Sequence, residues 1–270
     1  MKGVLKKYRG IFSSLLLSAA LLATGAVTRG QQQKEDARDV NVTNPNDSFY
    51  YPARYGKNFP KVYTTATQDA PGVDSSVARL WKTLQMLKAS NTIIGASLVN
   101  FSARANILFT YEPVEWAYSF WRNEDGVVRV SSAFPVSEEF ETVLLLHEII
   151  HGVQKSTRLI NGDLSLPIRD FQTSVLVYEA AAMVGGNLAA FELYHRGVPG
   201  PWEQMRKSMP MKCKQMEENW SLSCKDSTSF ASALEKTGLL SLHQQFEDKT
   251  WLTSYNMGVV IRYMRALAEK

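Results

Sequence analysis

The chain has 270 residues, of which 45% are hydrophobic, 11% aromatic and 21% charged, a composition typical of a globular protein. Its formal net charge is +4, but residues 1–26 hold four basic and no acidic side chains, so the remainder carries 26 of each sign. A neutral remainder lacks the basic surface that binds nucleic acid, and we expect no nucleic-acid partner.

The first 26 residues have the three parts of a secretory signal. Basic residues at positions 2–9 precede an apolar run at 11–22, and residues 24–26 (Thr-Gly-Ala) are small enough for cleavage after Ala26. We therefore expect an exported protein, periplasmic or secreted. The alternative is an uncleaved membrane anchor, because residues 11–27 reach the lower limit of a spanning segment. Membrane contact is expected only in that case.

Residues 27–74 show no clear periodicity and are rich in Gln, Asn, Asp, Pro and Tyr, which predicts an irregular N-terminal extension. Residues 75–270 are long enough for one domain with its own core. Apolar side chains between Val77 and Leu87 recur at helical spacing and predict a helix.

Strand-like stretches follow at residues 105–111, 116–122 and 127–132, and Asp125-Gly126 between the last two predicts a hairpin turn. Ser137 is the expected N-cap of a helix to about Lys155, with three glutamates at the positive end of the helix dipole. Further helices are expected at about 170–195, 229–248 and 254–268, the first closed by Gly197 and Pro199. This order predicts the α+β class.

The expected helix at 137–155 contains the sequence His-Glu-Ile-Ile-His, in which His147 and His151 are four residues apart. Side chains four apart share one face of a helix, so both imidazoles can reach one metal ion. Glu148 lies about 100° further round, where its carboxylate can hold a water on that metal. Neutral nitrogen ligands, an open position for water and a nearby base are what catalytic zinc needs.

An alternative interpretation of the motif is a polar patch on a surface helix. The neighbours are nearly all apolar, however, and a helix that is apolar almost all round is buried. Two histidines and a glutamate in such a helix need partners, or their desolvation costs several kcal/mol. Zinc is therefore the expected cofactor.

The motif and the order of elements resemble those of the zincin metallopeptidases. The metzincin branch continues the motif with Gly and His, and this chain has Gln154 and Thr157 there. It resembles instead the gluzincin-like zinc peptidases, most closely compact, uncharacterised bacterial families with H-E-x-x-H-x-x-Q and a later helical acid. The resemblance covers roughly residues 105–195, and it implies that zinc is held by His147, His151 and Glu179.

Glu179 is the only charged residue between Phe171 and Phe191, in an apolar stretch rich in Ala and Gly. A lone carboxylate there is costly unless it binds a cation or strong donors. It could instead pair with an arginine of the core. Rival third ligands are Asp163, Asp170 and His195.

These residues predict a zinc-dependent hydrolase, most simply a peptidase in which Glu148 is the general base. A peptide or protein substrate would add as a strand to an edge of the small sheet, with residues 127–132 as the candidate strand. Two alternatives remain open: an inactive zincin scaffold that binds peptides or a partner in the cell envelope, and a zinc amidase acting on a non-protein amide. A donor that stabilises the oxyanion is also expected. The sequence does not choose among the candidates Tyr178, Tyr194, His195, His243 and Tyr255.

Cys213 and Cys224 are the two cysteines of the chain. In an exported protein, two cysteines this close in sequence favour a disulfide, which would stabilise the fold by about 2–3 kcal/mol.

Overall fold

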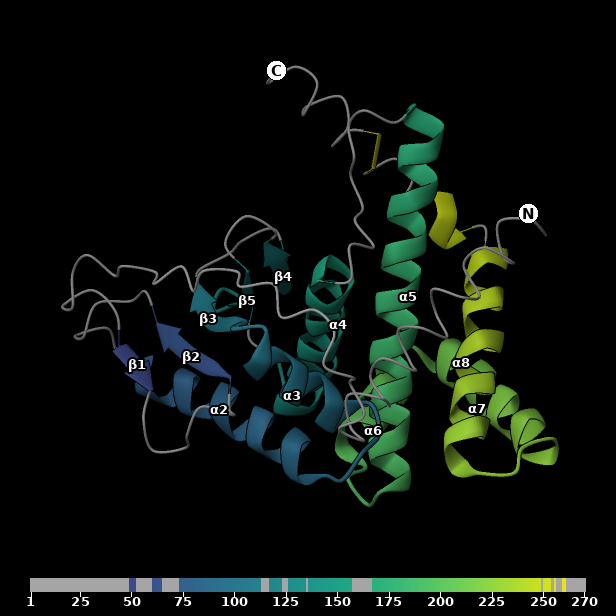
Figure 1. Cartoon of the computed structure of the whole chain (residues 1–270), viewed down its shortest axis with the longest axis horizontal. Helices are drawn as coiled ribbons and strands as arrows, with labels where there is room; N and C mark the ends of the chain where they lie inside the picture. The colour runs from purple at the N-terminus through teal and green to yellow at the C-terminus, as the bar shows by residue number, and fades with distance from the viewer. Residues whose placement is uncertain are drawn as a thin grey trace, which may run out of the picture. The chain divides into compact units, whose positions relative to one another are not determined.

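The computed structural model is drawn in Figure 1. It describes residues 49–51, 60–64, 73–112, 117–122, 126–134, 136–156, 167–248, 250–253, 255 and 259–260. The expected signal at 1–26 and most of the helix expected at 254–268 lie outside these residues. The chain divides into two units, Ser18–Gly152 and Val153–Lys270 with Met1–Leu17, and each is described by itself.

The first unit is built on a five-stranded mixed sheet with the order β1-β2-β3-β5-β4. β2 and β3 are parallel, β3 and β5 are parallel, and the outer pairs β1–β2 and β4–β5 are antiparallel. The strands are β1 (Phe49–Tyr51), β2 (Lys61–Thr64), β3 (Leu108–Glu112), β4 (Ser119–Arg122) and β5 (Val127–Ser131). Helices and a sheet together place the protein in the α+β class.

The hairpin of β4 and β5 is confirmed. Gly126 precedes β5 with φ of 70°, a left-handed conformation that glycine adopts without steric cost. The expectation that a substrate strand adds to residues 127–132 is wrong, because β5 pairs with β3 on one side and β4 on the other. The edge strands of the described sheet are β1 and β4.

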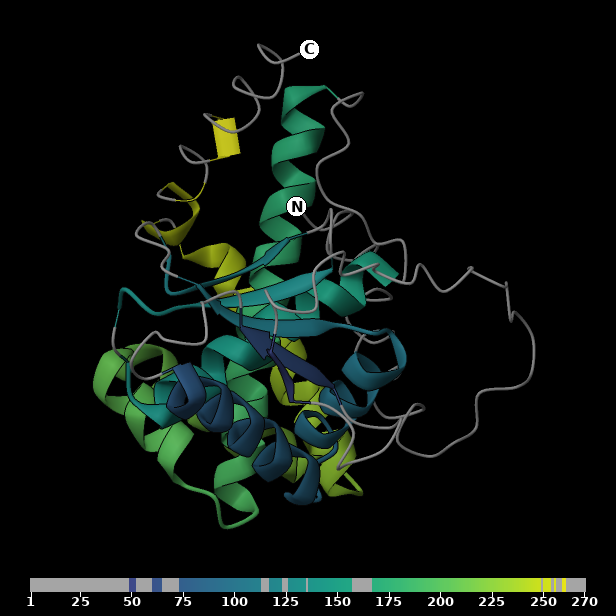
Figure 2. The same ribbon diagram turned by 90° about the vertical axis from the view of Figure 1, so that its left-hand side faces the viewer.

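α2 (Val73–Ala89) and α3 (Gly95–Arg104) pack against each other, and α2 also contacts β2 and β3. Figure 2 shows α2 running alongside the sheet. The helix expected at 77–87 is therefore present and longer than predicted. α3, β1 and β2 were not predicted from the sequence, and the two strands fall within the stretch 27–74 that showed no periodicity.

α4 (Glu138–Ser156) begins where the sequence predicted. The hydroxyl oxygen of Ser137 accepts a hydrogen bond from the backbone N–H of Phe140 at 3.2 Å, as an N-cap does. Val143, Leu145, Leu146, Ile149 and Ile150 are buried. The apolar run around the motif is thus part of the core.

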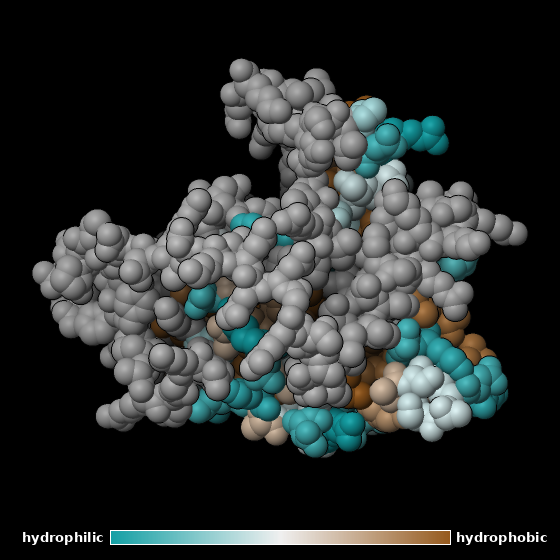
Figure 3. All heavy atoms as spheres, in the orientation of Figure 1, coloured by the Kyte–Doolittle hydropathy of each residue, from teal (hydrophilic) through white to brown (hydrophobic). Residues whose placement is uncertain are grey.

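In the second unit, α5 (Ile168–His195) contacts α6 (Gly200–Ser208) and α8 (Phe230–Glu247), and α7 (Pro210–Lys225) packs on both α6 and α8. α5 and α8 were expected, and Gly197 ends α5 with φ of 85°. α6 and α7 were not expected. Figure 3 shows hydrophobic residues among hydrophilic ones over α7 and α8. Met211, Leu222 and Leu240, which belong to these two helices, are exposed.

Among the described residues, α5 is the helix long and apolar enough to cross a membrane by length and composition. Its most apolar window is 78% buried, however, and the core helix of a globular protein passes the same test.

The predicted disulfide is wrong, because Cys213 and Cys224 are free. Both lie on α7, eleven residues apart, so their Cα atoms are separated by about 16 Å along a straight helix. A disulfide needs Cα atoms within about 7 Å of each other. Burial also raises the pKa of the Cys213 thiol to about 11, so this thiol is a poor nucleophile at neutral pH.

Candidate metal centre

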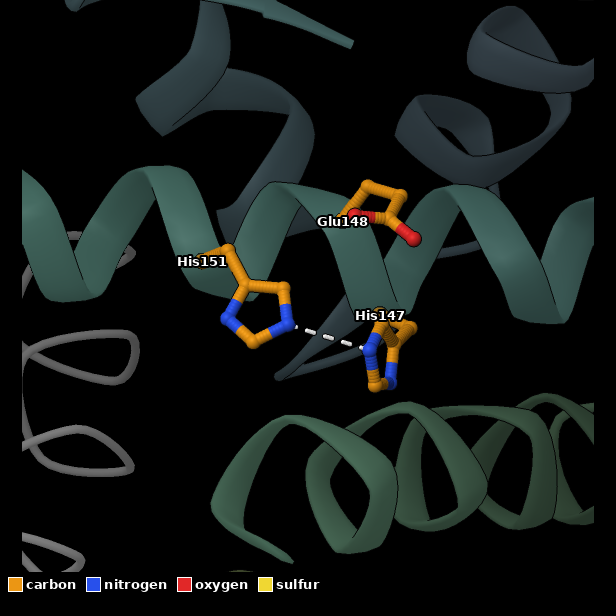
Figure 4. A group of neighbouring side chains, drawn as sticks. All are labelled: His147, Glu148 and His151. Atoms are coloured by element: carbon orange, nitrogen blue, oxygen red, sulfur yellow. Dashed lines mark hydrogen bonds between the residues drawn. The ribbon is translucent and has the colours of Figure 1, made fainter. Parts of the chain in front are cut away.

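His147 and His151 face each other across one turn of α4 (Figure 4). Their Nε2 atoms are 3.1 Å apart, and the ring planes are nearly perpendicular at 82°. Both side chains are half-buried, although the helix around them is mostly buried. The pair is therefore neither fully buried in the core nor fully exposed to solvent.

The spacing of the two nitrogens fits a tetrahedral metal. Zinc–nitrogen bonds of about 2.05 Å to two atoms this far apart would subtend an angle of roughly 100° at the metal, near the tetrahedral value. Imidazole nitrogen is also a donor that zinc prefers. The two histidines therefore fit zinc both in geometry and in donor type.

Glu148 completes the group. One oxygen of its carboxylate and one ring nitrogen of each histidine all lie within 4.8 Å of one another. Its side chain is only 6% exposed, and its Oε1 accepts a hydrogen bond of 2.9 Å from the Ser119 hydroxyl at the start of β4. A carboxylate held by one neutral donor keeps its second oxygen available to a water molecule.

A second buried carboxylate fixes the helix that carries the motif. Glu141 is 0% exposed, and its Oε2 accepts hydrogen bonds from Arg79 of α2 and Tyr111 of β3. The expectation that Glu141 acts at the helix dipole like Glu138 and Glu139 therefore misses its main interactions. α4 is joined through this one side chain to both a helix and a strand of the same unit.

The environment of Glu141 shifts several pKa values. Burial raises the pKa of Glu141, although the hydrogen bonds from Tyr111 and Arg79 act to lower it. Burial and the neighbouring Glu141 charge raise the pKa of Tyr111. Burial acts to lower the pKa of Arg79, but its hydrogen bond to Glu141 and the nearby negative charges together outweigh this, and the pKa is raised. Arg79 and Tyr111 therefore stay protonated as donors at neutral pH.

Glu179, the expected third ligand, lies near the middle of α5 and is half-buried. Gln154, in the last turn of α4, is 3% exposed and donates a hydrogen bond of 3.0 Å to the backbone oxygen of Tyr178. This bond, within the second unit, attaches the end of the motif helix to α5 at the residue before Glu179.

Two of the rival ligands, Asp170 and His195, lie near the two ends of α5. Asp170 is exposed in the first turn of α5, about 12 Å along the helix axis from Tyr178. His195 is exposed at the other end, about 26 Å from Tyr178, with its ring 4.5 Å from Phe191 and 5.0 Å from Trp220. Asp163 lies outside the described residues.

Among the described residues, two of the expected oxyanion donors are in contact, the rings of Tyr194 and His195 with centroids 5.5 Å apart near the end of α5. Tyr178 is buried, Tyr194 lies under the Arg206 guanidinium at 4.9 Å, and exposed His243 lies 3.4 Å from the Glu247 carboxylate. No oxyanion donor is therefore assigned.

The sequence did not predict the role of Ser119, nor the hydrogen bonds that Arg79 and Tyr111 donate to Glu141. These hydrogen bonds join residues 29, 62 and 30 positions apart. A single serine in a short strand carries no signal of its own. Glu141 lies in the first turn of α4 with Glu138 and Glu139, so the sequence carried no signal that set it apart from them.

Comparison with known protein families, with curated proteins and with solved structures finds no match. The functional assignment therefore depends on the geometry of the site.

Proposed function

We propose that the protein is a zinc-dependent hydrolase that cleaves peptide bonds. The observation that carries the proposal is the pair of Nε2 atoms 3.1 Å apart beside a buried glutamate on the same helix. We further propose a zincin-like arrangement, supported by the motif helix in the same unit as a mixed sheet whose edge strand, β4, contacts Glu148 through Ser119.

His147 and His151 would hold zinc, with Glu179 as the proposed third protein ligand. Glu179 is favoured over Asp170 and His195 because it is half-buried near the middle of α5, whereas they are exposed near its two ends. When bound, zinc supplies Lewis acidity, which polarises a carbonyl and acidifies a water.

Glu148 acts as the general base. Its Oε1 is occupied by the Ser119 hydroxyl, so its Oε2 accepts the proton of the attacking water. The water oxygen bonds to the carbonyl carbon, the carbon–nitrogen bond breaks, and Glu148 delivers the proton to the leaving amine. The substrate is held extended along β4, the strand whose outer edge is unpaired in the described sheet.

We also propose that the protein is exported, from the N-terminal signal at residues 1–26. A hydrolase of polypeptides released into the periplasm or the medium acts on peptide or protein substrates there. N-terminal sequencing of the exported protein should find a chain that starts near Val27.

Hydrolysis of a mixed peptide library by the purified full chain tests the proposal. We expect cleavage that stops on treatment with a zinc chelator and returns when zinc is added back. The matched variant is Glu179→Gln, which keeps the size of the side chain and removes its charge. We expect this variant to fold, to bind zinc more weakly by orders of magnitude and to lack activity.

Wild-type zinc affinity in Glu179→Gln would move the third ligand to Asp163, Asp170 or His195. Absence of cleavage by zinc-loaded protein across the library would contradict the peptidase assignment. Failure to bind zinc would contradict the whole proposal.

A further inference from the structure

The half-buried side chains of α4 recur with the period of the helix. From Phe140 to Gln154, the side chains that are not buried are those of Phe140, Leu144, His147 and His151. Spacings of four, three and four residues place them in one stripe along the helix. The stripe is apolar at its N-terminal end and carries the two histidines at the other.

An exposed aromatic side chain lies beside the apolar end of this stripe. Tyr118 is 51% exposed, and its ring lies 5.2 Å from that of Phe134 and 6.1 Å from that of Phe140, to which it is nearly perpendicular. Phe134 and Phe140 are themselves half-buried. The three rings form an aromatic patch that remains partly open.

The aromatic patch is continuous with the proposed catalytic group. Tyr118 directly precedes Ser119, whose hydroxyl holds Glu148, and the backbone oxygen of Tyr118 accepts a hydrogen bond of 2.8 Å from Ser131 N–H of β5. The segment at the start of β4 therefore contacts both the apolar end of the stripe and the general base. An open apolar surface next to convergent polar groups is typical of a ligand site.

We infer that Tyr118, Phe134 and Phe140 form a substrate subsite for a large apolar side chain, preferably an aromatic one. The inference rests on the proposed function, which supplies the reacting centre at His147 and His151. Phe140 is seven residues from His147, or about 10 Å along the helix. An extended peptide advances about 3.4 Å per residue, so the side chain bound belongs to about the third residue from the cleaved bond.

The occupant is an extended polypeptide segment rather than a compact ligand. The stripe is linear, and it lies in the same unit as β4, whose outer edge offers unpaired backbone groups in the described sheet. Edge pairing would supply affinity independent of sequence, and the aromatic patch would supply selectivity. Edge-to-face packing on three rings favours an aromatic side chain over an aliphatic one of similar area.

Peptide hydroxamates, which chelate zinc, test the subsite on the full zinc-loaded chain. Two series of peptides are needed, one with the hydroxamate at the C-terminus and one with it at the N-terminus. In each series the third residue from the hydroxamate is either Phe or Ala. We expect the Phe peptide of one series to bind about tenfold more tightly than its Ala partner in calorimetry. Equal affinities of Phe and Ala peptides in both series would overturn the subsite.

Variants test whether the tighter binding of Phe peptides depends on the ring of Tyr118. We expect the Phe preference to fall below about twofold in Tyr118→Ala and to persist in Tyr118→Phe, which keeps the ring. Leu222→Ala, at an exposed apolar position of α7, is the matched control and should behave as wild type. A preference that survives in folded Tyr118→Ala would overturn the assignment. A dimer that depends on Tyr118 in ultracentrifugation would assign the patch to a second copy of the chain instead.

The zinc-free protein separates failure of the subsite from failure of the proposed function. Zinc-dependent binding without a Phe preference overturns the subsite and leaves the zinc site standing. Hydroxamate binding that does not depend on zinc overturns the proposed function. The subsite is then judged by saturation-transfer NMR of Phe peptide amides on zinc-free protein. Saturation of the Phe ring protons in wild type but not in Tyr118→Ala supports the subsite, and no saturation of those protons in wild type overturns it.

Discussion

Two carboxylates, Glu141 and Glu148, lie seven residues apart on α4 and therefore on the same face of the helix. Both are buried, at 0% and 6% exposure. Glu141 accepts hydrogen bonds from the Arg79 guanidinium and the Tyr111 phenol, whereas Glu148 accepts one from the neutral hydroxyl of Ser119. A carboxylate that accepts from a guanidinium is held in an ion pair, whereas one that accepts from a hydroxyl is held by a neutral hydrogen bond. The two carboxylates therefore differ in their hydrogen-bond partners more than in their burial. Glu141 is held as a structural group, and Glu148 is the proposed reactive one.

The largest effect is expected for Glu148→Gln. Removal of a general base lowers turnover by about 10²–10⁴-fold, while the histidines and the fold remain. Peptide hydrolysis by the zinc-loaded variant measures this, with zinc content and urea unfolding as controls. Turnover above a few per cent of wild type would remove Glu148 from the mechanism.

The next effect is expected on stability, for Arg79→Met. Loss of the cation leaves the Glu141 carboxylate buried without its charged partner, and breaking such a pair costs about 3 kcal/mol of the free energy of unfolding. The lower end of the usual range applies because the Arg79 side chain is 31% exposed. Glu141→Gln is the matched variant. It should cost only about 1 kcal/mol, since a neutral amide still accepts both hydrogen bonds. Equal losses in the two variants would contradict the role given to the buried charge.

The deficit of Arg79→Met should depend on pH. Burial already raises the pKa of Glu141 in the folded protein, and loss of the cation raises it further. The folded variant then binds a proton that the unfolded chain has released, so its stability falls as pH rises above the unfolded value of about 4.5. Urea unfolding at pH 5 and pH 8 checks this, and the deficit relative to wild type should be larger at pH 8. A deficit independent of pH would show that Glu141 does not take up the proton.

The smallest effect is expected for Ser119→Ala. Loss of one hydrogen bond to the Glu148 carboxylate frees its orientation and should lower kcat about tenfold with KM and zinc content unchanged, and should cost about 1 kcal/mol of the free energy of unfolding. Ser119→Thr retains the hydroxyl and should restore most of kcat. Failure of threonine to restore turnover would mean that the serine acts through packing rather than through its hydrogen bond.

Local signals in the sequence predicted the local features well. Ser137 and the apolar run predicted the start and the burial of α4, and Gly126 predicted the turn of the β4–β5 hairpin. The facing pair His147 and His151 also follows from helical spacing alone. Each of these depends on residues close together in the chain, where helix and turn geometry fix the outcome.

Features decided by distant partners could not be predicted. Nothing near Glu141 indicates that Arg79, 62 residues earlier, will pair with it. β1 and β2 have three and four residues, too few for a periodic pattern, and they become strands through pairing within the sheet. α3 was obscured by polar residues on its buried side, Ser97 and Ser102. The cysteine spacing favoured a disulfide because α7 was not recognised as a helix, and with only four buried residues it has a weak amphipathic pattern.

The stoichiometry of zinc in the purified protein tests the central claim most directly. Elemental analysis of the full chain, after dialysis against trace zinc, should find one zinc per chain. We expect His147→Ala and His151→Ala to lose it while remaining folded, and His243→Ala, at an exposed position on α8, to keep it. Zinc-free wild-type protein, or one zinc per chain in both motif variants, would contradict the assignment of this site.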